Sequence, residues 1–315
     1  MGKAVRWRFS GKRTRAERIR QRANVVLRDA GITEKTQVRY YLGMKQILPV
    51  LERSRSLVEM DSNVSEWIQQ RWEAGDAIHQ VSDALCAIHH YEPWTRRHIP
   101  ESWKIFAIWR KLESSDRAPP LSQQIVDAWI MYCIAHCNLE FASMLALGFY
   151  GLLRTGECLQ VRPKDLLIGS DNGVISLAET KSGLRNAAKE TVSVQSDLAL
   201  EVLRATIKQK RSLQMDRVPI WSKSAQCFRN TFAHHIKRFN LETHRFRPYS
   251  LRRGGATALF QRTGSMEAAL LKGRWASTKV AKIYLADGLS FLPGLRFSAK
   301  ARDMLAEWSP EQQLR

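Results

Sequence analysis

Arginine, tryptophan and tyrosine side chains gather between residues 247 and 284, in an order that suits chemistry on a phosphate. Tyr249 and Arg252 are three residues apart, so a helix or turn would place them on one side. Trp275 precedes Tyr284 by nine residues. Arginine donates bidentately to phosphate oxygens and stays charged. A phenol that loses its proton can attack phosphorus and form a covalent phosphotyrosine, and neighbouring arginines favour the phenolate. These residue types therefore predict displacement at a phosphodiester.

Three further residues fit the same chemistry. Arg154 and Glu157 stand in G-L-L-R-T-G-E, directly after a very apolar stretch, where a charged pair is not typical of a solvated face. Two arginines can take the place of the metal ions that other phosphoryl-transfer enzymes use, so no cofactor is expected. We expect Glu157 to orient Arg154 or a neighbour rather than touch the substrate. Lys181, in the turn E-T-K-S-G, would protonate the leaving 5′-hydroxyl as a general acid.

Each of these residues, taken alone, also fits an ordinary structural role. An arginine after an apolar helix commonly extends its charge to solvent. A lysine in a K-S-G turn is commonly an exposed turn residue, and tryptophan is commonly buried. Tyr284 would equally serve as a buried aromatic residue of a helix. Arg252 and Arg253 would equally contact backbone phosphates without a catalytic role. The order and spacing of all these residues together favour the catalytic interpretation.

Helical periodicity predicts a small bundle ahead of these residues. Thr33 is the expected N-cap, with Thr36 as the alternative, of a helix that runs to about Glu52. Its apolar 3,4 pattern includes Val38, Tyr41 and Leu42. Pro49 is expected to kink or end this helix. Further helices are expected over 64–73, 78–90 and 102–112. Helical spacing favours bundle core over a base-stacking platform for five tryptophans: Trp67, Trp72, Trp94, Trp103 and Trp109.

Residues 113–120, E-S-S-D-R-A-P-P, are polar and end in two prolines, so they predict a linker between domains. Apolar periodicity then predicts helices over 122–136, capped by Ser122, and 140–153. Short runs bounded by turn residues predict antiparallel strands at 166–168, 174–180 and 189–194. Later helices are expected over 197–211, 225–239, 250–263, 266–271, 276–286 and 298–308. The predicted fold is mainly α with a small antiparallel β-sheet, in which a helical domain is followed by an α+β domain.

With this organisation the chain resembles the tyrosine recombinases, the phage-integrase family, over most of residues 30–285. The family's first box is an apolar stretch, then an arginine with a carboxylate three residues on, and it matches Arg154 and Glu157. The family's hairpin lysine matches Lys181. The resemblance implies that these residues belong to one catalytic site.

The second half of the resemblance contains one departure. The family's second box, usually His-x-x-Arg, matches Y-S-L-R, with Arg252 in place and Tyr249 where histidine normally stands. Trp275 matches a third position, and Tyr284 matches the nucleophile. Tyrosine can donate a hydrogen bond to a phosphate oxygen but is a poor base at neutral pH, so the substitution concerns the rate more than the fold. His244 is a nearby alternative for the missing histidine.

The resemblance implies an activity and a domain plan. The activity is site-specific recombination or integration, as in a mobile element, by cleavage and rejoining of double-stranded DNA through a 3′-phosphotyrosine. The implied assembly is a homo-tetramer on paired DNA sites, with the C-terminal tail docking on a neighbouring protomer. The implied segments are a basic N-terminal arm (1–29), a SAM-like core-binding domain (30–112), a linker (113–120), a catalytic domain (121–288) and a C-terminal tail (289–315).

Composition agrees with a nucleic-acid partner. The net charge is +20, which favours a polyanion and salt-dependent binding. Residues 1–28 hold ten lysines and arginines and one glutamate, with no apolar region after them, so they do not predict a secretory signal. They favour a DNA-binding arm or nuclear signal, with an organelle transit peptide as the alternative. No apolar run is long enough for a membrane span. The expected location is the nucleus, or the cytoplasm or nucleoid of a prokaryote.

The cysteines predict a reducing compartment rather than disulfides. They are five in number and scattered along the chain. Cys133, His136 and Cys137 share a helix face at spacings that zinc ligands use. Their apolar surroundings, and the lack of a second ligand pair with zinc spacing, favour an ordinary buried helix instead.

Three other functions compete with recombination. A type IB topoisomerase-like enzyme would use the same catalytic groups but relax supercoils as a monomer. A catalytically inactive, recombinase-derived DNA-binding protein would be unaffected by Tyr284→Phe. An RNA-binding protein would need aromatic RNP-like strand motifs, which the sequence lacks.

Overall fold

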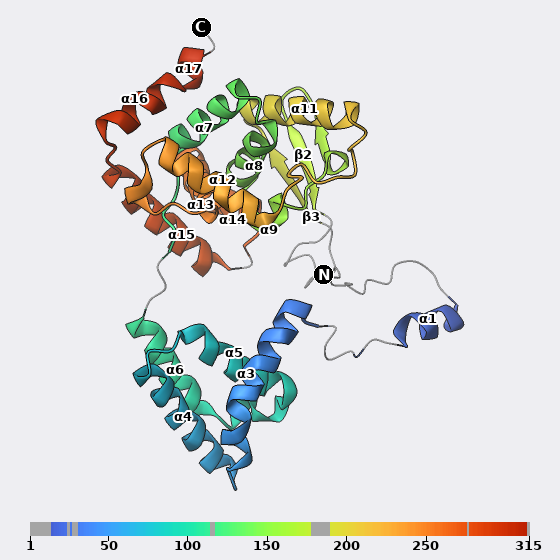
Figure 1. Cartoon of the computed structure of the whole chain (residues 1–315), viewed down its shortest axis with the longest axis vertical. Helices are drawn as coiled ribbons and strands as arrows, with labels where there is room; N and C mark the ends of the chain where they lie inside the picture. Colours follow the sequence, from blue (N-terminus) through green and yellow to red (C-terminus); the bar gives the residue numbers. More distant parts are fainter. Residues whose placement is uncertain are drawn as a thin grey trace. The chain divides into compact units, whose positions relative to one another are not determined.

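The computed structural model describes residues 14–23, 26, 31–113, 117–177, 190–275 and 277–313. The chain divides into two compact units, residues 1–116 and 117–315, and each has its own hydrophobic core (Figure 1). The division falls inside the segment 113–120, which its prolines and polar residues predict as a linker. Lys181 lies outside the described residues.

The first unit is a helical bundle preceded by a short basic helix, α1 (Arg15–Arg22). Its helices are α3 (Glu34–Glu52), α4 (Leu57–Glu73), α5 (Ile78–Tyr91) and α6 (Pro100–Leu112), with a 3₁₀ turn at Pro93–Arg97. The predicted N-cap of α3 is confirmed, because the Thr33 hydroxyl accepts a hydrogen bond from the backbone N–H of Thr36. Pro49 lies inside α3 and does not end it. Helix α4 begins before the expected Val64 because Ser56 caps it.

Helices α3 and α5 pack closely in this unit. A side chain at Gly43 would come within 2.8 Å of the backbone nitrogen of Ala84, so only glycine allows this approach. The core is formed by fully buried aliphatic residues, among them Ile47, Val64, Ile68, Leu85 and Ile88. The helix predicted from the apolar pattern at the start of α3 is confirmed. Val38, Tyr41 and Leu42 follow a helical pattern but are 54%, 64% and 52% exposed.

The tryptophans of the first unit do not share one environment. Trp67 and Trp109 are buried in the core, and Trp103 packs against it. Trp72 and Trp94 are exposed, because one lies in the last turn of α4 and the other in the 3₁₀ turn after α5. The core interpretation therefore holds for the first three and is wrong for the other two.

Helix α8 (Leu139–Phe149) is the centre of the second unit, and every residue from Phe141 to Phe149 is buried. Helices α7 (Gln123–Ala135), α11 (Asp197–Ser212) and α13 (Tyr249–Thr263) pack around it (Figure 1). Ser122 caps α7, as predicted. Helix α8 ends before the expected residue 153 because Leu152 adopts a left-handed conformation, with φ +47°. The chain then turns into the short helix α9 (Thr155–Cys158).

A three-stranded antiparallel sheet covers one side of this core. Its strands are β1 (Leu166–Ile168), β2 (Gly173–Leu177) and β3 (Glu190–Val194), in the order β1-β2-β3. Ile175 of β2 pairs with Val192 of β3, and both side chains point into the core. The predicted fold class, mainly α with a small antiparallel sheet, is confirmed.

The remaining helices of the second unit are α12 (Ala225–Arg238), α14 (Met266–Gly273), α15 (Thr278–Phe291), α16 (Ala299–Glu307) and α17 (Pro310–Gln313). Short 3₁₀ turns stand at Pro163–Asp165, Glu242–His244 and Leu292–Gly294. Helix α15 runs across the expected boundary at residue 288. Ala301 and Leu305 of α16 are fully buried in the core of the same unit. The described part of the tail therefore packs on its own chain.

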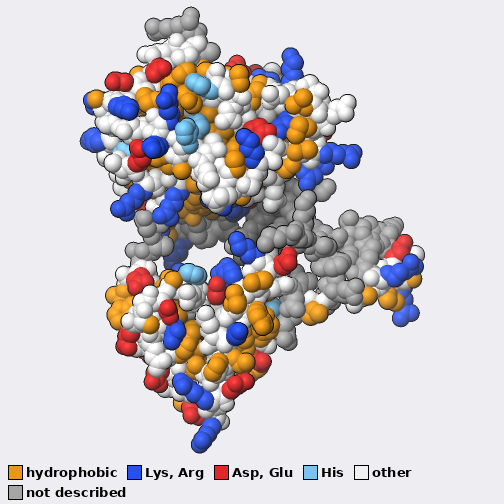
Figure 2. All heavy atoms as spheres, in the orientation of Figure 1, with side chains coloured by type: hydrophobic (Ala, Val, Ile, Leu, Met, Phe, Trp, Pro, Cys, Tyr) orange, Lys and Arg blue, Asp and Glu red, His pale blue; other side chains and the backbone are white. Residues whose placement is uncertain are grey.

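The surface is rich in basic side chains. Figure 2 shows lysine and arginine side chains scattered over the visible faces of both units, with acidic side chains between them. None of the described helices is long and apolar enough to cross a membrane.

Candidate active site

The arginines of the sequence R-R-G-G lie in the first turns of α13, which begins at Tyr249 directly after Pro248. The two glycines let this helix pack against neighbouring backbone. A side chain at Gly254 would come within 1.9 Å of the carbonyl oxygen of Leu121, and one at Gly255 within 2.0 Å of that of Phe149. Helix α13 is therefore pressed against the end of α8, where the chain turns toward Arg154.

Two tyrosines meet at their hydroxyl groups. Tyr249 of α13 donates a hydrogen bond of 3.1 Å to the hydroxyl oxygen of Tyr284 on α15. The indole of Trp275 stacks on the Tyr284 ring, with a centroid distance of 5.5 Å and an interplanar angle of 23°. Burial and the hydrogen bond to Tyr284 raise the pKa of Tyr249 to about 12. Tyr249 is therefore protonated at neutral pH and can act as a donor, but not as a base.

Arg252 lies beneath this aromatic group and is 1% exposed. Its guanidinium donates to the carbonyl oxygens of Leu152 and Gly273, and it lies 5.0 Å from the centre of the Trp275 ring. Burial lowers the pKa of Arg252 to about 10, and repulsion from Arg154 adds to the effect. The two carbonyls hold the guanidinium in one orientation, and its buried Nε has no hydrogen-bond partner among the described residues.

Glu157 joins two arginines. Its carboxylate accepts a hydrogen bond of 2.7 Å from the side chain of Arg154, one of 2.8 Å from the backbone N–H of Arg154, and one of 2.6 Å from Arg274. Burial alone would raise the pKa of Glu157, but attraction to Arg274 and the bonds from Arg154 outweigh it, so the pKa lies below its ordinary value. Glu157 is therefore an anion that orients Arg154, whose side chain remains 29% exposed.

Sequence reasoning missed the role of Arg274. This residue ends α14 in a left-handed conformation, with φ +53°, and its side chain is only 8% exposed. Besides Glu157, it faces the carboxylate of Glu190 on β3 at 3.6 Å. The only sequence signal is its position directly before Trp275, which says nothing about its partners.

The structure brings six of the seven sequence-predicted site residues together. Arg154 pairs with Glu157, and Tyr249, Trp275 and Arg252 are joined to Tyr284 directly or through the Trp275 ring. The charges of Arg154 and Glu157 act on the buried Arg252 and so relate the two sets. The seventh, Lys181, lies outside the described residues. His244, the alternative for the missing histidine, packs its ring against Phe246 and Phe297 instead.

Comparison with solved structures identifies the architecture. The XerH site-specific recombinase bound to a palindromic difH substrate matches with a TM-score of 0.57 at 10% identity, over 89% of this chain and 82% of that one. The Tn1549 transposon integrase in complex with transposon right-end DNA gives 0.57 at 12% identity, over 93% and 96%. A lambda integrase dimer bound to a core site gives 0.52 at 16% identity, over 90% and 97%. The chain has the fold of the tyrosine recombinases. No protein-family model and no curated protein matches it.

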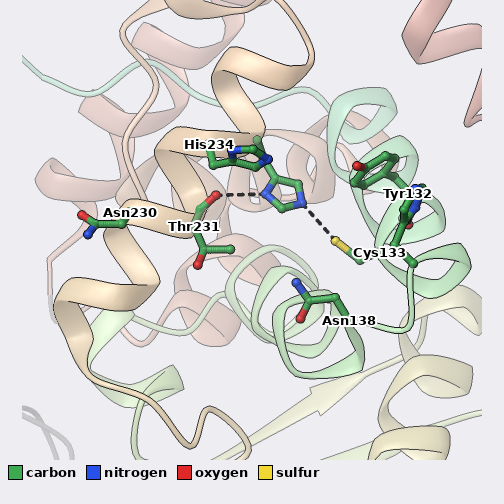
Figure 3. A pocket seen from close by; sticks show the side chains of 8 residues that line it. Tyr132, Cys133, Asn138, Asn230, Thr231 and His234 are labelled. Carbon is green, nitrogen blue, oxygen red and sulfur yellow. Dashed lines mark hydrogen bonds between the residues drawn. The ribbon is translucent and has the colours of Figure 1, made fainter.

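The recombinase fold of this chain also contains a pocket away from the tyrosines. A cavity of about 430 Å³ between α7 and α12 is lined by Tyr132, Cys133, His136, Asn138, Asn230, Thr231, His234 and His235 (Figure 3). The dashed lines in Figure 3 mark the hydrogen bonds of the His235 ring to Cys133 and to the Thr231 carbonyl. None of the six site residues lines this cavity.

The cysteines of this region do not form a metal site among the described residues. Cys133 is buried against His235, whereas Cys137 is exposed beyond the end of α7. The ring of His136 stacks on Tyr132 at 4.0 Å. Cys133 and His136 therefore have different partners.

Proposed function

We propose that the chain is a site-specific DNA recombinase or integrase, in which Tyr284 attacks a DNA phosphodiester and forms a 3′-phosphotyrosine. The observation that carries this proposal is the Tyr284 hydroxyl, which accepts a hydrogen bond of 3.1 Å from Tyr249. The Tyr284 ring stacks on Trp275, whose own ring lies over Arg252. The fold agrees with this chemistry.

The proposed step transfers a phosphoryl group from the DNA 5′-oxygen to the oxygen of Tyr284. The Tyr284 hydroxyl loses its proton to water, and the hydrogen bond from Tyr249 stabilises the phenolate oxygen. A bond forms between this oxygen and phosphorus while the P–O5′ bond breaks, and the 5′-oxygen takes a proton from Lys181. Arg154 and Arg252 offset the charge that develops on the non-bridging oxygens. Rejoining is the reverse of this step, with a 5′-hydroxyl as the nucleophile.

In this proposal the two units have different roles. All the described site residues belong to residues 117–315, which would form the catalytic domain. The helical bundle of residues 30–112 would grip DNA as the core-binding domain. The net charge of +20 supports a DNA partner. Strand exchange requires two DNA sites, so we further propose a homo-tetramer, which the mass of the protein–DNA complex in solution would test.

Covalent trapping tests the proposal. Wild-type protein and Tyr284→Phe are incubated with nicked suicide duplexes from a random-sequence pool and from DNA flanking the gene. The samples are denatured, and protein that remains on DNA is isolated and sequenced. We expect an adduct with the wild type that is missing from Tyr284→Phe, while both proteins shift DNA in a native gel.

The same experiment separates the other functions. DNA binding without an adduct from either pool would identify a protein that grips DNA without cutting it. Adduct formation that relaxes supercoiled plasmids, with no exchange between paired sites, would identify a topoisomerase-like enzyme instead.

A further inference from the structure

Arg253 contacts the proposed nucleophile, although the sequence suggests only a phosphate contact for it. The residue follows Arg252 in α13 and is 2% exposed. Its guanidinium carbon lies 5.2 Å from the centre of the Tyr284 ring. A cation at this distance is attracted to the face of an aromatic ring, and the attraction is strongest where water is excluded. Arg253 is thus a partner of the ring rather than a group exposed to DNA.

The same guanidinium also holds the helix that carries Tyr284. Its Nη2 donates a hydrogen bond of 2.8 Å to Asp287, which is three residues after Tyr284 and therefore on the same side of α15. Its Nη1 donates to the carbonyl oxygen of Ala118. One buried side chain therefore connects the reacting ring, the next turn of its helix and the chain just after the division between the two units.

The helices around Arg253 are packed so closely that this connection is stiff. A side chain at Gly288, next to Asp287, would come within 2.1 Å of the Thr257 hydroxyl on α13. Displacement of α15 along or away from α13 would break the contacts of Arg253 with both Tyr284 and Asp287. An apolar residue would pack two helices together without the desolvation penalty of a buried charge, so packing alone does not account for an arginine here.

We propose that Arg253 is a positioning residue of the cleavage reaction, which holds the Tyr284 ring and helix α15 in the place from which the hydroxyl attacks. The inference rests on the proposed function, and it gives Arg253 a role separate from that of Arg252. Arg253 acts through Tyr284 and does not touch the phosphate. A displacement of about 1 Å in a reacting group lowers a rate by as much as about 10²-fold.

The kinetic test uses Arg253→Met, Arg253→Lys and Asp287→Asn, with Arg117→Met as a matched control. Arg117 pairs with the same Asp287 oxygen at 3.2 Å but is 51% exposed, and its exposed ion pair is expected to contribute little. At saturating suicide DNA, Arg253→Met should slow adduct formation by about 10²-fold, with a Kd for DNA within about twofold of the wild type. Arg253→Lys should recover part of the rate. Adding Asp287→Asn to Arg253→Met should cost little more, because the two groups act together. Arg117→Met should match the wild type.

An NMR arm is independent of cleavage. In protein labelled with ¹³C in its tyrosine rings, the Tyr284 signal is the one missing from Tyr284→Phe, among seven tyrosines. Arg253→Met and Asp287→Asn should shift or broaden this signal in the free protein, whereas Arg117→Met should not. A thermal unfolding transition shows whether each variant is folded. If Arg253→Met does not fold, Arg253→Lys takes its place in both the kinetic and the NMR measurements.

The outcomes separate this inference from the proposed function. An unchanged Tyr284 signal or a wild-type adduct rate in Arg253→Met would overturn the positioning role. A parallel loss of rate and DNA affinity would make Arg253 a phosphate contact instead. If wild-type protein forms no adduct, the proposed reaction fails, yet the NMR signal still decides whether Arg253 holds the Tyr284 ring.

Discussion

Replacing Glu157 by glutamine removes the negative charge that Arg154 and Arg274 share, while it leaves the side chain almost the same shape. One amide oxygen can still accept a hydrogen bond, but the amide NH₂ then faces an arginine. Breaking a buried ion pair costs about 3–5 kcal/mol. Arg154 is 29% exposed and can be hydrated, so the loss of its ion pair contributes little to this cost. Arg274 is 8% exposed, and among the described residues its remaining ion pair is with Glu190 at 3.6 Å. We expect a loss of about 3 kcal/mol in the free energy of unfolding.

Thermal unfolding at pH 7 measures this loss. For a domain of this size, about 3 kcal/mol corresponds to a fall of roughly 6–12 °C in Tm. Because Glu157 has a lowered pKa in the folded protein, its contribution is present above the unfolded value of about 4.3 and is lost as pH falls through the folded value. The Tm difference should therefore narrow in acid. Adduct formation should fall as well, because Arg154 loses the group that orients it.

Asp216→Asn is the matched control. Asp216 pairs with Arg211 at 3.3 Å, and both side chains are largely exposed, so its loss should change stability by less than about 1 kcal/mol. A Tm of Glu157→Gln within about 2 °C of the wild type would refute the interpretation of Glu157 as the shared anion of two arginines.

Three further perturbations have defined outcomes. Tyr249→Phe removes the donor to Tyr284 and should slow adduct formation about tenfold or more without loss of DNA binding, and equal rates would deny Tyr249 that role. Burial lowers the pKa of His235 to about 4. The neutral ring therefore contributes roughly 3 kcal/mol to the free energy of unfolding above about pH 6.5, and this contribution is lost as pH falls toward 4. Urea unfolding between pH 7 and 4 should show this loss, and His235→Gln should flatten it. Lys181→Ala should slow cleavage and be rescued by a substrate with a better 5′ leaving group, and no rescue would rule out the acid role.

The sequence predicts best what is local. Thr33 and Ser122 cap helices as expected, because a cap depends on a few neighbouring residues. The apolar pattern of Val38 and Tyr41 identifies a helix, but periodicity does not tell whether another element covers that face, and here both side chains are exposed.

The partners of the buried arginines were beyond local reasoning. Arg253 stands next to Arg252 in sequence, and nothing nearby reveals that it points to Tyr284 rather than to a phosphate. Its direction depends on the approach of α13 and α15, which are separated in the chain by α14. The same holds for Arg274, whose partners Glu157 and Glu190 come from other elements. Tertiary packing determines the partners of these arginines, and the spacing of residues along the sequence does not reveal how the helices pack.

Charge balance in this cluster supports the anionic substrate that we propose. Arg274 faces Glu157 and Arg253 faces Asp287, but no ion pair joins Arg252 to a carboxylate in the part of the chain that the structure describes. Arg252 is also the arginine whose pKa burial lowers to about 10. Burial of Arg252 therefore carries a free-energy cost that attraction to Tyr249 and Glu157 offsets only in part. A phosphate that binds beside Arg252 stabilises the charged form, and by linkage it stabilises the fold that holds the tyrosines together. The burial of Arg252 thus supports the phosphodiester substrate that we propose for this site.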